Sequence, residues 1–208
     1  MIFKIKLIFH WIKIYVYNFL YKINILNIHS PFVFNFHDTV VNSNGDFLLL
    51  ENFKKKNKEL FIKKNHREIT FLFKSVNYFK VKSVYIDCND FFYLLTVGSA
   101  VYKGNISIKN IDLFSDAQLE VLEKNNIKIK KNILPELAFI FDIGNIDIKT
   151  IINYKFVIIY KPHKDKKSKY IWNNISYLPK FKISIDLYDF GILVNINASR
   201  NKFYFRYR

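Results

Sequence analysis

From Ser83 onward, apolar runs rich in β-forming residues alternate with stretches that have the spacing of amphipathic helices. The strand candidates are residues 83–87, 105–111, 127–131, 137–142 and 155–160, and the helices between them are 91–102, 116–125 and 147–154. Strands that alternate with helices predict a parallel sheet joined by right-handed crossovers. After Tyr160, a charged helix over 165–177 is followed by strands alone, at 181–187, 190–197 and 202–207. We therefore expect an α/β, doubly wound, mostly parallel sheet with antiparallel C-terminal strands.

The loop after the first predicted strand has an unusual composition. The strand runs into Cys88-Asn89-Asp90 and then into the helix over 91–102. In nucleotide-binding α/β domains this loop carries glycines, so that the backbone approaches the ligand and presents N–H groups at the start of the helix. Here no glycine lies between Gly45 and Gly98. The pattern indicates a nucleotide-cofactor fold whose first ligand-binding loop has lost its usual glycines.

Length and cysteine content limit the kind of protein this is. The chain has 208 residues, half of them hydrophobic, which is enough to bury a core of its own. We expect residues 1–82 to form an N-terminal helical accessory section and residues 83–208 to form the α/β domain. The single cysteine, Cys88, excludes an internal disulfide and a cysteine-based zinc site, and it fits a reducing, cytoplasmic compartment.

The first 28 residues are apolar but are interrupted by charged residues. Their longest uncharged run, residues 14–21, is shorter than the roughly 20 residues that a membrane-spanning helix needs. Lys6, His10, Lys13 and Tyr17 recur at helical spacing and form one narrow polar stripe. Two interpretations stay open. The helix packs against the domain or a partner subunit, or it lies as a basic helix on an anionic membrane surface.

The formal net charge is +16, which raises nucleic acid as a partner. The charge is unevenly placed. Residues 1–85 carry 14 Lys and Arg against 5 Asp and Glu, residues 86–150 carry 7 against 9, and residues 151–208 carry 12 against 3. Lys, Asn, Ile, Phe and Tyr are all residues of A/T-rich codons, so drift in base composition also explains the excess. If nucleic acid binds, residues 54–67 and the C-terminal arginines are the expected phosphate contacts.

Several short sequence motifs resemble those of one bacterial family and occur in the same order along the chain. Asn27-Ile28-His29-Ser30-Pro31-Phe32-Val33-Phe34 is similar to the "HSPFVF" signature of class I S-adenosylmethionine (SAM)-dependent, O-methyltransferase-like proteins. The other matching words are residues 72–79, Ile143-Gly144-Asn145 ("DGNH"), His163 with Trp172 ("DDIHWS…AW"), residues 184–187 with Gly191 ("IDLF…G") and residues 202–206. Together these matches extend over essentially the whole chain. The resemblance implies a Rossmann-like methyltransferase fold, SAM as cofactor and methyl transfer to a small-molecule hydroxyl.

The chain also departs from the family at positions that matter for chemistry. The glycine-rich "ELGTSLG" falls on residues 85–91, where no glycine survives. In "DGNH" the Asp lies one position early, as Asp142, and the His is replaced by Ile146. The paired acids after the fifth strand are replaced by Tyr160 and Lys161. Because a lysine adds positive charge where a divalent cation would bind, we expect no metal site.

Candidate donor-binding residues lie at the ends of the predicted strands. Asp87 and Asn89, with Asp90, offer acceptors for an amino group at the first loop. Asp112 follows the second strand and is placed to accept ribose hydroxyls, as acids do in dinucleotide folds. The third group, Asp142 with Gly144 and Asn145, is expected to reach the adenine side or the methionine end of SAM.

His163 is the candidate catalytic base, because the unperturbed pKa of histidine lies near neutrality. It follows the fifth strand, and the competing interpretation is a surface histidine in a lysine-rich turn. Three functions stay open. The chain is a working methyltransferase, a pseudoenzyme that kept the fold as a binding or scaffold protein, or a basic nucleic-acid-binding protein.

Overall fold

The computed structural model describes residues 30–43, 48–58, 66–101, 104–131 and 134–204, together with Ile12 and Val16. The predicted N-terminal helix lies outside the described residues except for Ile12 and Val16, which are helical and about half exposed. Arg206 and Arg208 also lie outside them. None of the helices that the structure describes combines the length and the apolar character needed to cross a bilayer.

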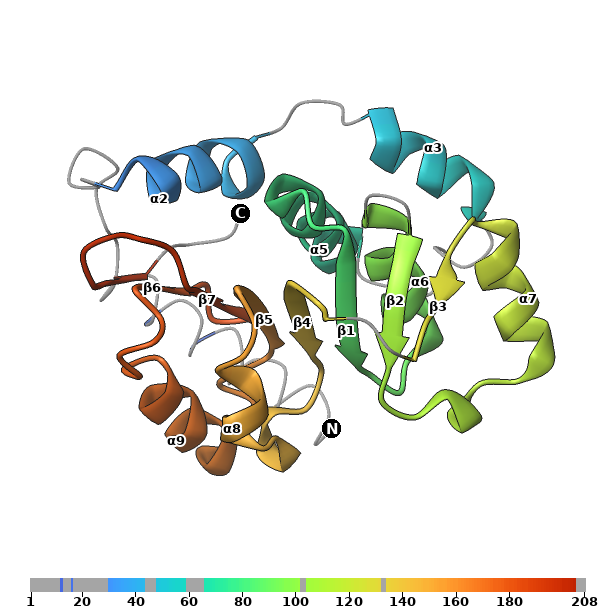
Figure 1. Cartoon of the computed structure of the whole chain (residues 1–208). Coiled ribbons are helices and arrows are strands. Elements are labelled where there is room, and N and C mark those ends of the chain that lie inside the picture. The colour runs from blue at the N-terminus through green and yellow to red at the C-terminus, as the bar shows by residue number, and fades with distance from the viewer. Residues whose placement is uncertain are drawn as a thin grey trace.

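Eight strands form a single sheet in the order β3-β2-β1-β4-β5-β7-β6-β8 (Figure 1). Their bounds are β1 (Ser83–Asp87), β2 (Asn105–Ile108), β3 (Lys128–Ile129), β4 (Leu137–Ile140), β5 (Phe156–Tyr160), β6 (Ile183–Asp186), β7 (Phe190–Val194) and β8 (Asn201–Tyr204). The pairings among β1 to β5 are all parallel, and β7 is antiparallel to both β5 and β6. The expected fold class is confirmed. The strand order reverses between β1 and β4, and in such sheets ligands bind outside the carboxyl ends of the strands at this point.

The last strand lies where the sequence pattern does not place it. A turn separates β7 from β8, but β8 pairs in parallel with β6, with Ile185 opposite Phe203. Strand β7 already has β5 on one side and β6 on the other, so neither of its edges is available. The outer edge of β6 is open, and β8 reaches it by crossing over the end of β6.

Helices cover both faces of the sheet (Figure 1). Successive residues of a strand point to opposite faces, so each strand contributes side chains to both layers. In β4, Leu137 and Phe139 join one hydrophobic cluster, and Ala138 and Ile140 join the other. The first cluster includes residues of α2 (Pro31–Phe36), η2 (His37–Val41), α3 (Leu48–Lys56), α5 (His66–Phe79), α6 (Phe91–Ala100) and α7 (Asp116–Lys124). The second includes residues of α8 (Ile148–Ile151) and α9 (Lys166–Ile175). The result is a three-layer α/β/α arrangement.

Local sequence signals account for several helix starts. Ser115 and Gln118 form a capping box at the start of α7, in which each side chain accepts from the backbone N–H of the other residue. At the start of α2, the Ser30 hydroxyl accepts from Val33 N, and Pro31 occupies the first helical position. Phe36 of α2 is fully buried and packs edge-on against Phe71 of α5, so these helices share the core of the sheet. The domain division at residue 82 stays a prediction.

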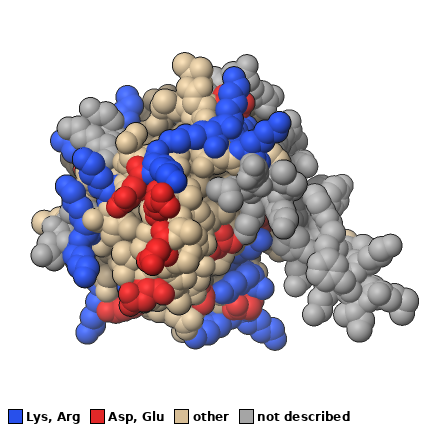
Figure 2. Space-filling model, turned by 90° about the vertical axis from the view of Figure 1, so that its right-hand side faces the viewer, with Lys and Arg blue, Asp and Glu red and all other residues tan. Residues whose placement is uncertain are grey.

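Charges of both signs share the face that carries α3 and α7. Figure 2 shows acidic side chains in a stripe down this face, bordered by lysines and arginines. Lys54 pairs with Glu51 at 2.8 Å and Lys124 with Glu120 at 2.8 Å, while the Lys56 ammonium donates to the carbonyl of Lys124. On this face, the basic charge of the 54–58 run is therefore partly neutralised and does not form one continuous cationic surface.

Candidate functional site

The candidate site lies at the carboxyl ends of strands β1, β2, β4 and β5. Backbone hydrogen bonds hold the segments after these strands side by side. Lys109 N donates to Ile86 O at 3.1 Å, and Phe141 N donates to Asp87 O at 2.9 Å. The residues that follow β2 and β4 thus flank the end of β1, as the strand order requires.

The first loop is held by its own side chains. The Asp87 carboxylate, 15% exposed, forms an ion pair with Lys109, with Oδ2 and Nζ 2.9 Å apart. Cys88 is buried, and its sulfur accepts from Asp90 N at 3.3 Å. Asp90 caps α6 by accepting from Phe92 N at 2.9 Å, whereas Asn89 is exposed. The N–H groups of Asp90 and Phe92 are therefore engaged within the loop itself.

Asp142, Gly144 and Asn145 lie within one turn after β4, where they bind one another. The Asp142 carboxylate accepts from Gly144 N at 3.1 Å and from the Asn145 amide at 2.9 Å. It also pairs with Lys164, which follows β5, at 2.5 Å. The hydrogen bond from Lys164 is the main reason that the pKa of Asp142 lies below its ordinary value, and burial opposes the shift.

Replacing Lys164 with methionine is expected to raise the pKa of Asp142 toward its ordinary value. Because the folded-state pKa is lowered, the pair stabilises the fold at pH values above the ordinary carboxyl pKa, and this contribution is lost as the pH falls through the folded-state value. A carboxyl ¹³C NMR titration of the two proteins measures the shift. A matched change of the nearby exposed Lys167 to methionine should leave the titration of Asp142 unchanged, and equal titrations in all three proteins would contradict the assignment.

Asp112 lies beyond the end of the second strand. It is exposed in the short helical turn η4 (Ile111–Leu113), four residues beyond the end of β2. The residue directly after β2 is Lys109, and this is the side chain that reaches Asp87. A cation therefore occupies the place at the strand end where an acid for the ribose was expected. A role for Asp112 at the ribose stays a prediction.

His163 is mostly buried, with 10% of its side chain exposed, so it is not a surface histidine. Its Nε2 lies 2.9 Å from each carboxylate oxygen of Asp186, at the end of β6. The same carboxylate accepts from Trp172 Nε1 at 2.7 Å and from Tyr188 N at 3.1 Å. His163 thus belongs to a buried group on the β6 side of the sheet, and Lys164 is the neighbour that links this segment to Asp142.

A second buried polar cluster was not predicted. Glu68 of α5 accepts hydrogen bonds from the hydroxyls of Tyr93 at 2.5 Å and Tyr160 at 2.9 Å. The Lys161 ammonium lies 3.5 Å from the other Glu68 oxygen and 4.7 Å from the centre of the Tyr160 ring. Phe141 stacks on Tyr160 with ring centres 4.8 Å apart. The only sequence signal of this cluster was the presence of Tyr160 and Lys161 where the similar family has paired acids. Glu68 on α5 and Tyr93 on α6 lie far from these two residues in the sequence.

The pKa values in this cluster reflect its burial. Burial, and then the hydrogen bond to Glu68, raise the pKa of Tyr93 well above its ordinary value. Burial likewise raises the pKa of Tyr160. For Lys161, burial lowers the pKa, but the interactions with Tyr160 and Glu68 outweigh it and the net direction is upward. At neutral pH both tyrosines are therefore protonated donors and the lysine is charged.

The residues at this edge do not fit SAM well. A sulfonium donor with an amino group and ribose hydroxyls needs acceptors and open backbone N–H groups. The carboxylates of Asp87 and Asp142 each already hold a lysine, and the N–H groups of Phe92 and Gly144 already donate to side chains. Within the described part of the chain, no three His, Cys, Asp or Glu side chains are grouped to hold a metal ion. The expectation of no metal site stays a prediction.

Comparisons with known proteins identify the fold. No protein-family model and no curated protein matches the sequence. Among solved structures, a methyltransferase from Geobacter sulfurreducens is 8% identical, covering 85% of this chain and 100% of that chain with a TM-score of 0.50. An O-methyltransferase from Streptomyces achromogenes in complex with SAM is 8% identical over 78% and 94% of the two chains, with a TM-score of 0.49. One from Bacillus cereus in complex with SAH is 10% identical over 76% and 94%, with a TM-score of 0.47. The chain therefore has the methyltransferase fold, with the eight-stranded sheet and antiparallel C-terminal hairpin described above.

Proposed function

We propose that this protein keeps the methyltransferase fold as a binding or scaffold protein and no longer uses SAM. The ion pair between Asp87 and Lys109, in a first loop without glycine, is the observation that carries the proposal. In a SAM site an acid at the end of β1 is useful only if its carboxylate faces the donor. Here the carboxylate holds a lysine, and the lysine brings positive charge toward a ligand that is itself a cation.

The shape of the loop supports the same conclusion. Four non-glycine residues of the described chain have positive φ, namely Lys80, Asn126, Lys161 and Tyr188, and none of them belongs to the first loop. The loop has therefore not kept a left-handed turn at the cost of strain. Of its residues, Asn89 is exposed and Asp90 is partly exposed, and each carries a side chain where a glycine would carry none.

Calorimetric titration with SAM tests the proposal. We expect no heat of binding at donor concentrations up to the millimolar range. Lys109→Ala is the informative variant, because it releases the Asp87 carboxylate, and Lys124→Ala in α7 is the matched lysine control. Micromolar binding by the unchanged protein at a ratio of one to one would overturn the proposal. Binding that appears only in Lys109→Ala would identify the ion pair as the cause of the loss.

A second candidate function is methyl transfer to a small-molecule hydroxyl with weak donor binding. The contact between His163 and the buried Asp186 favours it, because a carboxylate that orients a histidine is a common arrangement for a general base. If millimolar SAM binds, Asp112→Ala should weaken that binding about tenfold, which corresponds to one hydrogen-bonded acid. An unchanged affinity would remove Asp112 from the ribose site.

A further inference from the structure

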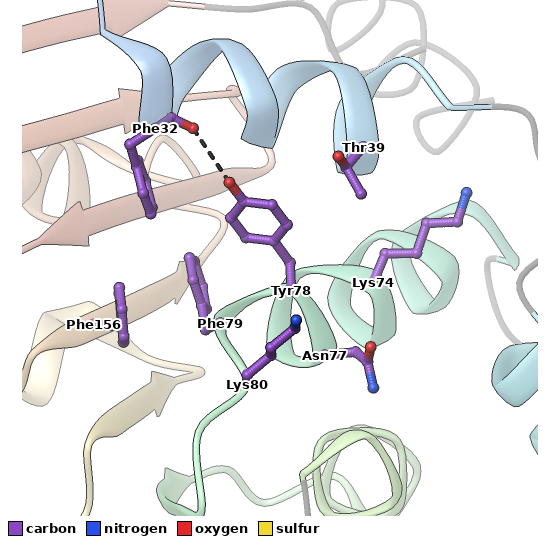
Figure 3. A pocket seen from close by; sticks show the side chains of 8 residues that line it. All are labelled: Phe32, Thr39, Lys74, Asn77, Tyr78, Phe79, Lys80 and Phe156. Atoms are coloured by element: carbon purple, nitrogen blue, oxygen red, sulfur yellow. Dashed lines mark hydrogen bonds between the residues drawn. The ribbon is translucent and has the colours of Figure 1, made fainter.

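A hollow lies at the opposite end of the strands from the candidate site, near the start of β5. It has a volume of about 550 Å³ and is enclosed by α2, η2, the end of α5 and the start of β5. Figure 3 shows its side chains, with the rings of Phe32, Phe79 and Phe156 on one side and Thr39, Lys74 and Asn77 on the other. We call these the aromatic wall and the polar wall. The volume falls in the range of small-molecule sites, which is about 300–1,000 Å³.

The aromatic wall consists of three nearly parallel rings. Phe79 and Phe156 have centres 4.4 Å apart and planes inclined by 13°, and Phe32 lies 6.4 Å from Phe79 with planes inclined by 2°. Tyr78 forms the corner, because its ring meets Phe32 edge-on and its hydroxyl donates to the Phe32 carbonyl at 3.4 Å. The rings are therefore held in place, and an aromatic ligand gains stacked or edge-to-face contacts with them that an aliphatic group does not.

The charged side chains that line the hollow are all positive. None of the residues that line it is acidic, and two of them are lysines, Lys74 and Lys80. A third lysine, Lys155, has its ammonium 5.3 Å from the centre of the Phe156 ring. Lys74 is buried and donates to the carbonyl and hydroxyl of Ser43, and burial lowers its pKa. Among the described residues no carboxylate pairs with Lys74.

Two polar groups remain to bind a ligand. Lys80 is exposed at the end of α5, where its φ of 51° turns the chain and its N–H donates to Asn77 O. The half-buried Asn77 side chain lines the hollow and makes no hydrogen bond to another described side chain or backbone group. An ammonium and an amide at one rim offer several N–H donors and suit a carboxylate or a phosphate.

We propose that this hollow binds a small planar aromatic anion, a ring that carries a carboxylate or a phosphate. The ring packs on the aromatic wall, and the anionic group meets Lys80 and Asn77 at the rim. The site is separate from the strand ends where the family resemblance places the donor, and it goes beyond the proposed loss of SAM binding. The inference rests on the binding function proposed above and names the class of ligand that would be bound.

A panel of four probes tests the two halves of the proposal. Benzoate and phenyl phosphate carry both the ring and the charge, benzyl alcohol carries only the ring, and cyclohexanecarboxylate carries only the charge. We expect the first two to bind about tenfold more tightly than the last two in calorimetry at low salt. The preference between benzoate and phenyl phosphate then distinguishes a carboxylate ligand from a phosphate ligand. Equal affinity for all four probes would overturn the proposal.

Two variants locate the binding. Lys80→Asn removes the charge, and asparagine tolerates the left-handed backbone at this position. It should weaken benzoate about fivefold or more, because one charge-assisted contact is lost, whereas Lys167→Asn at the other end of the strands should not. Phe32→Leu keeps an apolar side chain but removes a ring, and it should abolish the preference for benzoate over cyclohexanecarboxylate. Binding that survives both variants would refute the site.

NMR distinguishes the binding of benzoate in this hollow from the binding of SAM at the candidate site. Benzoate should shift the side-chain amide signals of Asn77 and leave those of Asn145 at the opposite end of the strands unchanged. Excess SAM should not displace benzoate. Displacement by SAM would place both ligands in one site and contradict the inference, while a failure of SAM to bind leaves it intact.

Discussion

Replacing Asp186 with alanine is expected to lower the free energy of unfolding by about 3–5 kcal/mol, the usual cost of removing one partner from a buried polar pair. Asp186 is 1% exposed and accepts from the side chains of His163 and Trp172 and from Tyr188 N. Trp172 is fully buried, and its ring lies against Gly191, where an added Cβ would come within 2.7 Å of it. Without the carboxylate, these three donors lose their acceptor.

Urea denaturation followed by circular dichroism measures this loss. Asp186→Asn keeps the volume and one acceptor oxygen, so it should cost less, about 1–3 kcal/mol. Asp112→Ala is the matched control, since Asp112 is exposed, and it should change stability by no more than about 0.5 kcal/mol. A loss under about 1 kcal/mol for Asp186→Ala would mean that the buried group does not hold α9 on the sheet.

Replacing Glu68 with alanine is expected to destabilise the protein by about 3 kcal/mol, the lower end of the range for buried ionic groups. The change removes the carboxylate that accepts from both Tyr93 and Tyr160, so the two buried hydroxyls lose this acceptor and keep the hydrogen bond between them, at 3.1 Å. The Lys161 side chain is 37% exposed and can turn toward water, so its share of the loss is small. The cluster joins α5, α6 and the end of β5, and we expect all three elements to loosen together.

Hydrogen exchange and urea denaturation together check this result. Glu68→Gln keeps an acceptor for the hydroxyls and should lose about 1–2 kcal/mol. Tyr93→Phe removes one hydroxyl, with its hydrogen bonds to Glu68 and Tyr160, and serves as the single-hydroxyl comparison. If Glu68→Ala unfolds at the same urea concentration as the unchanged protein, the cluster is not structural. Faster amide exchange in α6 without a change in α7 would support the expected location of the loosening.

The architecture was predictable because its signals are periodic and local. Alternation of strands and helices from Ser83 onward predicted the parallel sheet, and the fold class is confirmed by the strand order. The strand ends were less accurate. Residues 109–111 were expected in the second strand, but the chain leaves the sheet after Ile108 and enters a helical turn at Ile111. The third strand is only Lys128–Ile129, because it lies at the edge and pairs with β2 alone.

Parts of the candidate site were predictable for the same local reason. Asp142, Gly144 and Asn145 lie within one turn, and the structure brings them together. The partners that decide their chemistry come from elsewhere in the chain. Lys164 binds Asp142 from the segment after β5, and Lys109 binds Asp87 from the segment after β2. Neither pair has a sequence signature, because each depends on which strands are neighbours.

The sequence by itself determined the layers of the fold, the helix caps and the absence of glycine in the first loop, since these are properties of residues close together in the chain. Only the tertiary structure decided that Asp87 faces a lysine, that His163 rests on Asp186, and that Glu68 joins two tyrosines. These contacts span from 22 to 92 residues and form only after the sheet order and register bring the strand ends together. Such pairs cannot be read from the sequence, because their members lie far apart along the chain. Burial then strengthens their interaction.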